Sequence, residues 1–370
     1  MFHAAGIRNV FALIVVCCGS GFLSRASAQD PSMLALGGND PILLGQGKET
    51  AGDPAFTAEH YLYLYRFVDA ANRELFRKDP ERYGIQMGGG CGRMGPASGK
   101  GDVERYAVHD GRIYVFASDQ CRAAFLKKPD AFLDPDDAIA TGSEAAAARA
   151  RELLDLAEKT HGGAKLLVAK SLRFTQETTT KLKDGTERKD GRREIIRLPG
   201  DVRVESWWGV PRFVEVDAAS GGFEVNSKGE STTRHATASR STRRSFWRRP
   251  LLILRERGRA DFKAFHVGEG MVGKFKTEQV VVSFDGMTTT LAIDPVSGLV
   301  HGTSSRGRGP EFWFGKVERA FSDFRDVGGL MIPFKTEVVF DGKPRPESTV
   351  IWNAVEVDAA IEPEDFRRPK

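Results

Sequence analysis

A repeat near the N-terminus constrains the fold of this chain more than any other feature. Residues Tyr65–Tyr83 and Tyr114–Phe132 align at a constant offset of 49 positions. The matched pairs are Phe67 with Phe116, Arg73 with Arg122, Phe76 with Phe125, Pro80 with Pro129 and Tyr83 with Phe132. Because the shared residues are those that pack or end structural elements, the repeat indicates duplicated packing rather than duplicated chemistry.

Each copy has the pattern of a strand, a short helix, a proline and an aromatic residue. In the first copy, residues 61–67 alternate as in a strand, Asp69 is a suitable N-cap, and Pro80 ends the predicted helix. In the second copy the predicted strand covers 113–116, and Ser118 caps a helix that reaches about residue 128, before Pro129. A glycine-rich loop over residues 88–102 separates the two copies.

The first 28 residues have the features of a secretory signal peptide. Arg8 carries a positive charge, Val10–Cys18 is an apolar run, and Ala26–Ala28 is a small-residue cleavage site. The run is too short to span a bilayer, and no later segment is apolar for long enough. We therefore predict a bacterial chain that is exported to the periplasm or secreted, is soluble after cleavage, and has no nucleic-acid partner.

From residue 166 onward the sequence is typical of antiparallel strands. The β-branched and aromatic segments predicted as strands are 172–174, 202–207, 213–216, 274–284, 288–293, 334–340 and 349–357. Asp-Gly dipeptides at 184–185, 190–191, 285–286 and 341–342 predict turns between them. Before the strands, Ser143 is a suitable N-cap for a helix that ends at Gly162-Gly163.

The N-terminal repeat resembles the YHS domain, a small module found in metal-related and other proteins. The residues that carry the resemblance are Asn39-Asp40-Pro41, the strand ending Tyr65-Arg66-Phe67, and Phe76, Pro80 and Tyr83. The family often has a cysteine directly after its Asp-Pro, whereas this chain has Ile42. The resemblance implies a YHS-like module with a partial second copy over residues 29–138.

The C-terminal part resembles the superfamily of periplasmic outer-membrane lipoprotein-sorting (lipoprotein carrier) proteins. Three strings carry the match: Leu153–Leu172, Phe321–Gly329 followed by Ile332-Pro333-Phe334, and Val355–Val357 leading to Ile361 and Phe366. The resemblance implies a curved half-barrel closed by helices, with an apolar concave face that accepts acyl chains. It assigns residues 143–370 to this domain and leaves 139–142 as a linker.

The predicted fold class is therefore α+β. A small α/β YHS-like module precedes a curved antiparallel β-sheet half-barrel with helices on its concave side.

Two cysteines, Cys91 and Cys121, remain after the predicted cleavage. In an oxidising compartment the simplest expectation for such a pair is a disulfide. The alternative is a metal site, because Cys91 and Met94 have the spacing C-x-x-M, and thiolate and thioether ligands suit Cu(I). The third possibility is that Cys91 and Cys121 are free or redox-active thiols. Asn72 occupies the first-copy position that matches Cys121, so the repeat does not itself require a ligand there.

The arginine-rich segment 240–259 contains apolar residues that predict a helix or lid after Pro250. These lid candidates are Trp247, Leu251, Leu252 and Leu254. One reading is a cationic amphipathic lid that touches anionic lipid or a membrane surface. The other is a solvated surface segment whose leucines pack on the sheet.

Aromatic residues on or beside the predicted strands are candidates for a hydrophobic ligand groove. The four selected are Trp207, Phe213, Trp313 and Trp352. In a half-barrel, the same residues can equally be ordinary core.

No catalytic motif is found. Gly268–Gly273 fits G-x-G-x-x-G but precedes strands and opens no helix, so the nucleotide reading fails. We predict a non-enzymatic periplasmic binding protein whose half-barrel holds a lipid or acyl chain and whose YHS-like module serves interaction or sensing. The rival hypothesis is a copper-type metal-binding protein using Cys91, Met94 and Cys121. A third possibility is a scaffold for an unknown protein partner.

Overall fold

The computed structural model describes residues 32–182, 184–209 and 212–369. The chain from Ser32 onward forms one compact unit. The predicted signal peptide lies outside the described residues. Among the helices that are described, none combines the length and apolar character needed to cross a membrane.

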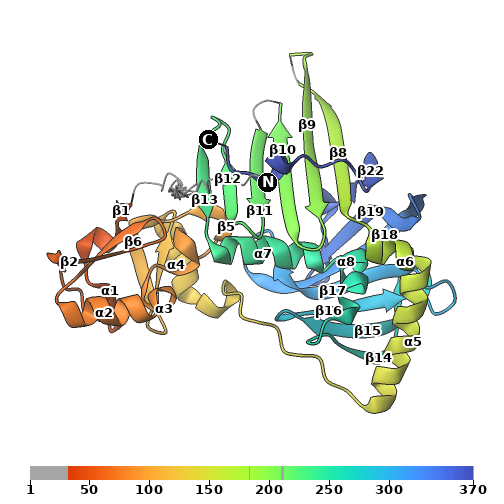
Figure 1. Ribbon diagram of the computed structural model, residues 1–370, viewed down its shortest axis with the longest axis horizontal. Helices are drawn as coiled ribbons and strands as arrows, with labels where there is room; N and C mark the ends of the chain where they lie inside the picture. Colours follow the sequence, from red (N-terminus) through yellow and green to blue (C-terminus); the bar gives the residue numbers. More distant parts are fainter. Residues whose placement is uncertain (1–31, 183, 210–211, 370) are drawn as a thin grey trace, which may run out of the picture. The chain divides into compact units, whose positions relative to one another are not determined.

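Residues 33–116 contain two small sheets of the same design (Figure 1). In the first, the strand order is β1-β3-β2, and in the second it is β5-β4-β7-β6. The strands are β1 Met33–Leu34, β2 Asp53–His60, β3 Tyr63–Phe67, β4 Gly90–Cys91, β5 Gly95–Lys100, β6 Asp102–His109 and β7 Arg112–Phe116. In each sheet a short strand runs parallel to the second strand of a hairpin, β1 beside β3 and β4 beside β7.

The helices of this region begin and end where the sequence predicts. Asp69 accepts a hydrogen bond from the N–H of Asn72 (2.8 Å) and caps α2, Ala70–Lys78. Ser118 accepts one from the N–H of Cys121 (3.2 Å) and caps α4, Asp119–Lys127. Both helices stop just before a proline. Pro80 then begins the short helix α3, Pro80–Tyr83. The helix α1, Pro41–Gly45, precedes the first hairpin.

The repeat is visible as duplicated packing. The rings of Phe67 and Phe76 lie 5.2 Å apart at 57°, and those of Phe116 and Phe125 lie 5.2 Å apart at 56°. All four side chains are fully buried. The prediction that the copies share packing is therefore confirmed.

The duplication also reaches further towards the N-terminus than the sequence shows. Leu36-Gly37-Gly38 has positive φ angles of 56°, 61° and 86°, and Met87-Gly88-Gly89 has 58°, 60° and 81°. Each of these turns ends in a carbonyl that accepts a hydrogen bond, from Gly52 and Gly101 respectively. The first copy therefore begins near Leu36 and the second near Met87, an offset of 51 instead of 49.

Residues 171–357 form two antiparallel sheets. In the first the strand order is β13-β12-β11-β10-β9-β8-β22, and in the second it is β14 through β20 in sequence, with β21 paired to β19. The first sheet contains β8 Ser171–Lys181, β9 Glu187–Arg197, β10 Asp201–Trp208, β11 Arg212–Asp217, β12 Gly222–Val225, β13 Ser231–Arg234 and β22 Ala354–Val357. The second contains β14 Lys263–Val272, β15 Phe275–Phe284, β16 Met287–Ile293, β17 Val300–Arg308, β18 Phe314–Val327, β19 Leu330–Phe340, β20 Lys343–Pro344 and β21 Val350–Ile351.

Three Asp-Gly turns are confirmed and one is wrong. Asp184-Gly185 lies between β8 and β9, with a φ of 86° at Gly185. Asp285-Gly286 and Asp341-Gly342 have positive φ angles and connect β15 to β16 and β19 to β20. Gly191, in contrast, lies inside β9, where it pairs with Trp207 across the sheet. A Cβ at this position would overlap the indole of Trp207, so the glycine allows a close side-chain approach instead of a turn.

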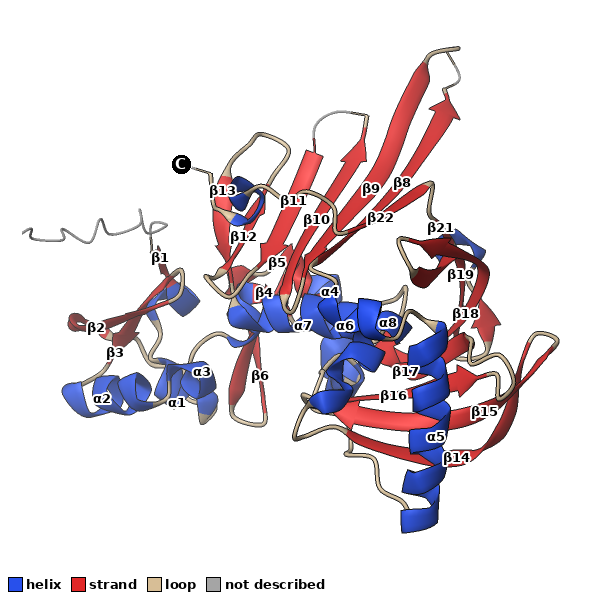
Figure 2. Cartoon of the chain, turned by 45° about the vertical axis from the view of Figure 1, so that its right-hand side comes forward, coloured by secondary structure: helices blue, strands red, loops and turns tan. Residues whose placement is uncertain are grey.

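Four helices accompany these sheets (Figure 2). They are α5 Glu144–Thr160, α6 Ala164–Val168, α7 Ala236–Trp247 and α8 Pro250–Arg255. The predicted cap of α5 is confirmed, because Ser143 accepts from the N–H of Ala146 (3.2 Å). The helix α5 packs along β14 and β15, and α8 contacts both α5 and α6. The helix predicted after Pro250 is α8, which has this proline in its first turn, and the residues before it form a second helix, α7.

One large hydrophobic core joins the helices to both sheets. It includes Leu153 and Leu154 of α5, Phe174 of β8, Leu254 of α8 and Val282 of β15. The α+β fold class is confirmed: the large antiparallel sheets are open and not closed into a barrel. Residues 133–143 contain no helix or strand. The domain boundary at 139–142 stays a prediction.

Candidate functional site

The candidate ligand site is a cavity of about 270 Å³ enclosed by strands of both sheets and by the α7–α8 region. Its apolar walls include Leu172 and Phe174 of β8, Leu251 of α8, Phe321 of β18, Ile332 of β19 and Trp352. The volume is close to the lower end, about 300 Å³, of pockets that bind small molecules.

Two features of the strands direct these side chains into the cavity: the alternation of side chains along β8, and the gap between β21 and β22. Leu172 and Phe174 are two residues apart on β8 and therefore face the same side of the sheet. Trp352 lies in the short gap between β21 and β22, where its N–H donates to the carbonyl of Phe334 (2.9 Å). Its ring is 5.2 Å from that of Phe174. The break between the two strands thus lets one aromatic side chain bridge the two sheets.

The structure brings together some of the predicted groove and lid residues and not others. Trp352, Leu251 and Leu252 line the cavity. Trp247 and Leu254 are buried in the core but do not line it. Trp207 is buried on β10 beneath the guanidinium of Arg193 (5.9 Å) and away from the cavity. Phe213 and Trp313 are exposed and also lie outside it.

Three arginines also line this apolar cavity: Arg248, Arg249 and Arg319. Arg248 pairs with Asp137 (2.6 Å) and Arg249 with Glu194 (2.6 Å). Two buried guanidinium atoms here make no hydrogen bond to the described residues, Nη1 of Arg319 on β18 and Nε of Arg248. Burial, followed by the charges of Arg249 and Arg248, lowers the pKa of Arg319 to about 10. Arg319 is therefore still cationic at neutral pH and has a donor available.

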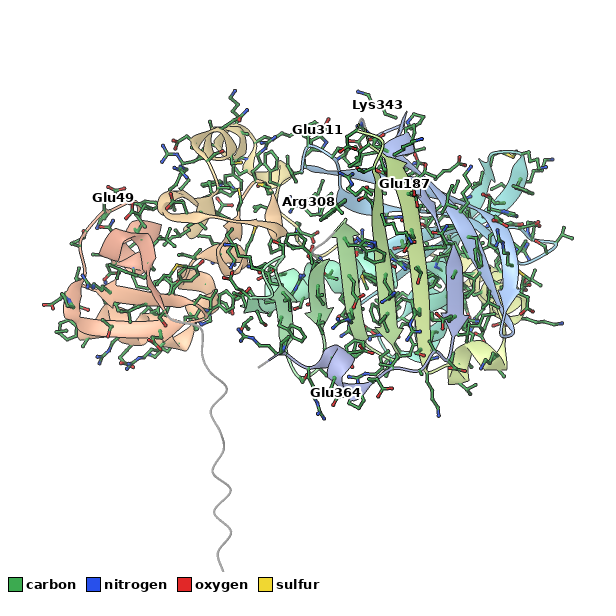
Figure 3. All side chains as sticks on the ribbon, turned by 90° about the horizontal axis from the view of Figure 1, so that it is seen from above. Glu49, Glu187, Arg308, Glu311, Lys343 and Glu364 are labelled. Carbon is green, nitrogen blue, oxygen red and sulfur yellow. The ribbon has the colours of Figure 1, made fainter. Side chains whose placement is uncertain are left out.

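A second, more polar cavity of about 190 Å³ adjoins the first. The two share Ser245, Arg248 and Arg319, so these residues form the boundary between them. The second cavity continues to Arg306 and Arg308 of β17. Figure 3 marks Arg308, whose Nη1 and Nη2 donate to the carbonyls of Arg93 (3.0 Å) and Phe132 (3.2 Å). The arrangement as a whole pairs an apolar chamber with a cationic one.

The sequence reasoning missed Arg319, Phe321 and Ile332. A signal was present, since Arg319 and Phe321 are spaced for one face of a strand, but the resemblance rests on the string Phe321–Gly329, which begins after Arg319. The sequence cannot show that this face meets β8 from the other sheet.

The predicted metal residues Cys91, Met94 and Cys121 do lie in one cluster. Both cysteines are free thiols and are buried, and Met94 packs against the same cluster. Burial raises the pKa of the Cys121 thiol, but hydrogen bonds from Ser118, Arg93 and Cys91 outweigh this effect and the net pKa is lowered. The two thiols thus belong to one buried cluster. Both the disulfide and the metal site stay predictions.

The first copy of the repeat shows what occupies the equivalent place there. Asn72 corresponds to Cys121 at offset 49, and Asp40 corresponds to Cys91 at offset 51. The Nδ2 of Asn72 donates to Oδ2 of Asp40 (2.9 Å). In the first copy, a buried carboxylate and a half-buried amide thus join the helix to the preceding segment, and the second copy has two cysteines at the corresponding positions.

The arginines of segment 240–259 are largely engaged within the protein. Their partners are Asp136 for Arg240, the Trp247 ring for Arg243, Asp134 and Asp136 for Arg244, Asp137 for Arg248, Glu194 for Arg249, the carbonyls of Leu166 and Ala169 for Arg255, Asp155 and Glu158 for Arg257, and Glu256 and Asp261 for Arg259. Contact with an anionic membrane surface stays a prediction.

No protein-family model and no curated protein matches the chain. Among solved structures, it is similar to a putative outer membrane lipoprotein-sorting protein domain from Vibrio parahaemolyticus (6% identity, TM-score 0.36). It is also similar to a DUF1329 family protein from Desulfovibrio piger (10%, 0.36) and to a LolA superfamily protein from Nitrosomonas europaea (9%, 0.38). Each comparison covers 59% of this chain and 97% of the other. The YHS resemblance stays a prediction.

Proposed function

We propose that this chain is an exported, non-enzymatic binding protein that holds the acyl chain of a lipid or fatty acid in the cavity between its two sheets. The observation that carries the proposal is the apolar cavity that ends at the Nη1 donor of Arg319. The N-terminal module serves interaction or sensing. The working compartment is the bacterial periplasm.

The chemistry of the cavity favours an amphiphile with an acidic head. Each methylene that is transferred from water to such a wall contributes about 0.8 kcal/mol. A carboxylate or phosphate at the boundary would accept the hydrogen bond that Arg319 lacks, and hydrogen bonds to charged groups contribute about 1.5–3 kcal/mol each. The apolar chamber thus suits the chain, and the cationic boundary suits the head.

Delipidated mature protein should take up a fluorescent fatty acid at micromolar concentration. Trp352→Asp places a charge in the apolar wall and should weaken uptake at least about tenfold. Because Trp352 is buried, Val350→Trp provides a second variant that fills the cavity without a charge. Trp313→Asp is the matched control, since Trp313 is exposed and lies outside the cavity.

A further variant separates head recognition from chain binding. Arg319→Met should weaken binding of the fatty acid and leave binding of its methyl ester unchanged. If the wild-type protein takes up neither probe, the proposed function is wrong.

A second candidate function is binding of a soft metal ion such as copper at Cys91, Met94 and Cys121. The observation that favours it is that all three residues join one buried cluster. Reduced protein should bind one Cu(I) in competition with a chelator, and Cys91→Ser should abolish that binding, because a thiolate ligand is lost. A thiol count of zero in protein purified without reductant would instead establish the disulfide.

A further inference from the structure

A cluster of two histidines and a glutamate lies apart from both sites described above. The ligand atoms of His60, Glu81 and His235 all lie within 4.8 Å of one another. The Nε2 atoms of His60 and His235 are 3.3 Å and 3.5 Å from Oε1 of Glu81. Two ligands that are each about 2.1 Å from a tetrahedral ion are about 3.4 Å apart. Both histidine–glutamate distances therefore already match a shared ion, and a small rotation would bring the two nitrogens together.

The three side chains come from segments that are remote in sequence. His60 ends β2, Glu81 lies in α3, and His235 is the N-cap of α7. Tyr61 supports the junction, because its hydroxyl donates to the carbonyl of Thr233 (2.6 Å) and its ring is 4.8 Å from that of His235. An ion held here would fasten the first copy of the repeat to the start of α7.

Neighbouring residues hold the side chain of His235 in one position. Its side chain is only 10% exposed. Gly88 faces it, and a Cβ at that glycine would overlap the histidine side chain. Nδ1 lies 2.5 Å from Oγ1 of Thr237. Nδ1 also accepts a hydrogen bond from the N–H of Thr237 (3.2 Å) as the N-cap of α7, and this leaves Nε2 as the ring nitrogen that faces Glu81.

The second copy of the repeat supplies an internal comparison. His109 and Asp130 occupy the positions of His60 and Glu81 at offset 49, and their atoms are also 3.3 Å apart. The histidine–carboxylate pair is therefore part of the duplicated module. In the second copy, Nε2 of His109 is also 3.6 Å from Oδ2 of Asp110, and both of its carboxylate partners are largely exposed. The first copy instead gains a second histidine, His235, whose side chain is only 10% exposed.

The geometry points to a binding site for a divalent transition-metal ion of the zinc class at His60, Glu81 and His235. Imidazole and carboxylate are ligands that zinc prefers, and three protein ligands leave one position for water. The ion would draw α7 towards β2 and α3 and so stabilise that junction. The site does not depend on the acyl-chain cavity or on the cysteine cluster.

The test is titration of chelator-stripped, untagged mature protein with Zn²⁺ by calorimetry. One ion should bind per chain. Glu81→Gln keeps the shape of an exposed side chain (65% exposed) and should not disturb folding, yet it removes the anionic ligand. We expect it to lower Zn²⁺ affinity by more than the about 10–100-fold that loss of an outer-shell partner produces. His235→Gln should do the same. The control His109→Gln should bind as the wild type does.

Absorption of the Co²⁺-substituted protein identifies the ligands independently of folding in the variants. Nitrogen and oxygen ligands give ligand-field bands without thiolate-to-cobalt charge transfer, and we expect this spectrum. A charge-transfer band would assign the ion to Cys91 and Cys121 and overturn the proposal. Equal Zn²⁺ affinity in the wild type and Glu81→Gln, or no binding at all, would also overturn it.

Discussion

Replacing Asp137 by alanine is expected to lower the free energy of unfolding by about 3–5 kcal/mol, because it leaves a buried guanidinium without its counter-charge. Asp137 is only 8% exposed. It accepts hydrogen bonds from Nη2 of Arg248 (2.6 Å) and from the N–H of Thr288 (2.9 Å). One carboxylate thus ties the irregular segment 133–143 both to the end of α7 and to β16. Urea denaturation followed by far-UV circular dichroism measures the loss.

The neighbouring Asp136 is a matched control. It also pairs with arginines, Arg240 and Arg244, but is 59% exposed. Its pKa is lowered, since these arginines outweigh the effect of desolvation. Arg244 is buried, but without Asp136 it keeps Asp134 (3.7 Å) and the carbonyl of Gly286 (3.2 Å) as partners. Ion pairs with an exposed carboxylate contribute about 0–1 kcal/mol, so Asp136→Ala should destabilise less than Asp137→Ala. The double variant Asp137→Ala/Arg248→Met, which removes the stranded charge, should recover part of the stability. If Asp137→Ala and Asp136→Ala lose the same free energy, the buried-pair explanation is wrong.

This ion pair shows why the arginine-rich segment was difficult to interpret from the sequence. The choice between a membrane-facing lid and a solvated surface depends on where the counter-charges are. Most of them come from 134–137, more than 100 positions earlier, or from other distant elements. Local composition shows eight arginines but cannot show that an acidic segment returns to lie beside them.

Patterns over a few neighbouring residues predicted the elements whose ends depend on caps, prolines or alternating side chains. The residues close in sequence are sufficient to predict four features. These are the cap at Ser143, the helix ends before Pro80 and Pro129, and the strand of residues 334–340. Two of the strands that were missed, β9 and β14, are unusual in composition. The strand β9 contains the run Glu187–Glu194, which is charged and interrupted by Gly191, and β14 contains Gly268 and Gly270. Pairing along long neighbouring strands overrides the weak intrinsic preference of these residues.

The candidate sites were predictable only in part, for a related reason. Trp352 and the leucines of α8 were found because large apolar residues stand out in a sequence. Arg319 was not, because its significance depends on an atom that the opposite sheet leaves without a partner. The triad of His60, Glu81 and His235 has no spacing that marks it, since its members are brought together by three separate elements.

Asp40→Ala is the second substitution expected to have a large effect, about 3–5 kcal/mol. The carboxylate is fully buried and accepts four hydrogen bonds. Oδ1 accepts from the N–H groups of Ile42 (2.8 Å) and Leu43 (3.3 Å), and Oδ2 accepts from the N–H of Val68 (2.8 Å) and the amide of Asn72 (2.9 Å). Each donor left buried without a partner costs about 1–3 kcal/mol. Thermal or urea unfolding measures the effect.

Asparagine at position 40 tests whether shape or acceptor chemistry matters. Asp40→Asn keeps the volume but turns an NH₂ group towards donors on one side, so it should destabilise nearly as much as alanine. Asp53→Ala is the control, because Asp53 makes one exposed hydrogen bond, from the N–H of Ala55 (2.8 Å). An Asp40→Asn protein as stable as the wild type would contradict this account. The expected loss would instead mean that Asp40 stabilises the module through its four hydrogen bonds, two to the start of α1 and two to Val68 and Asn72.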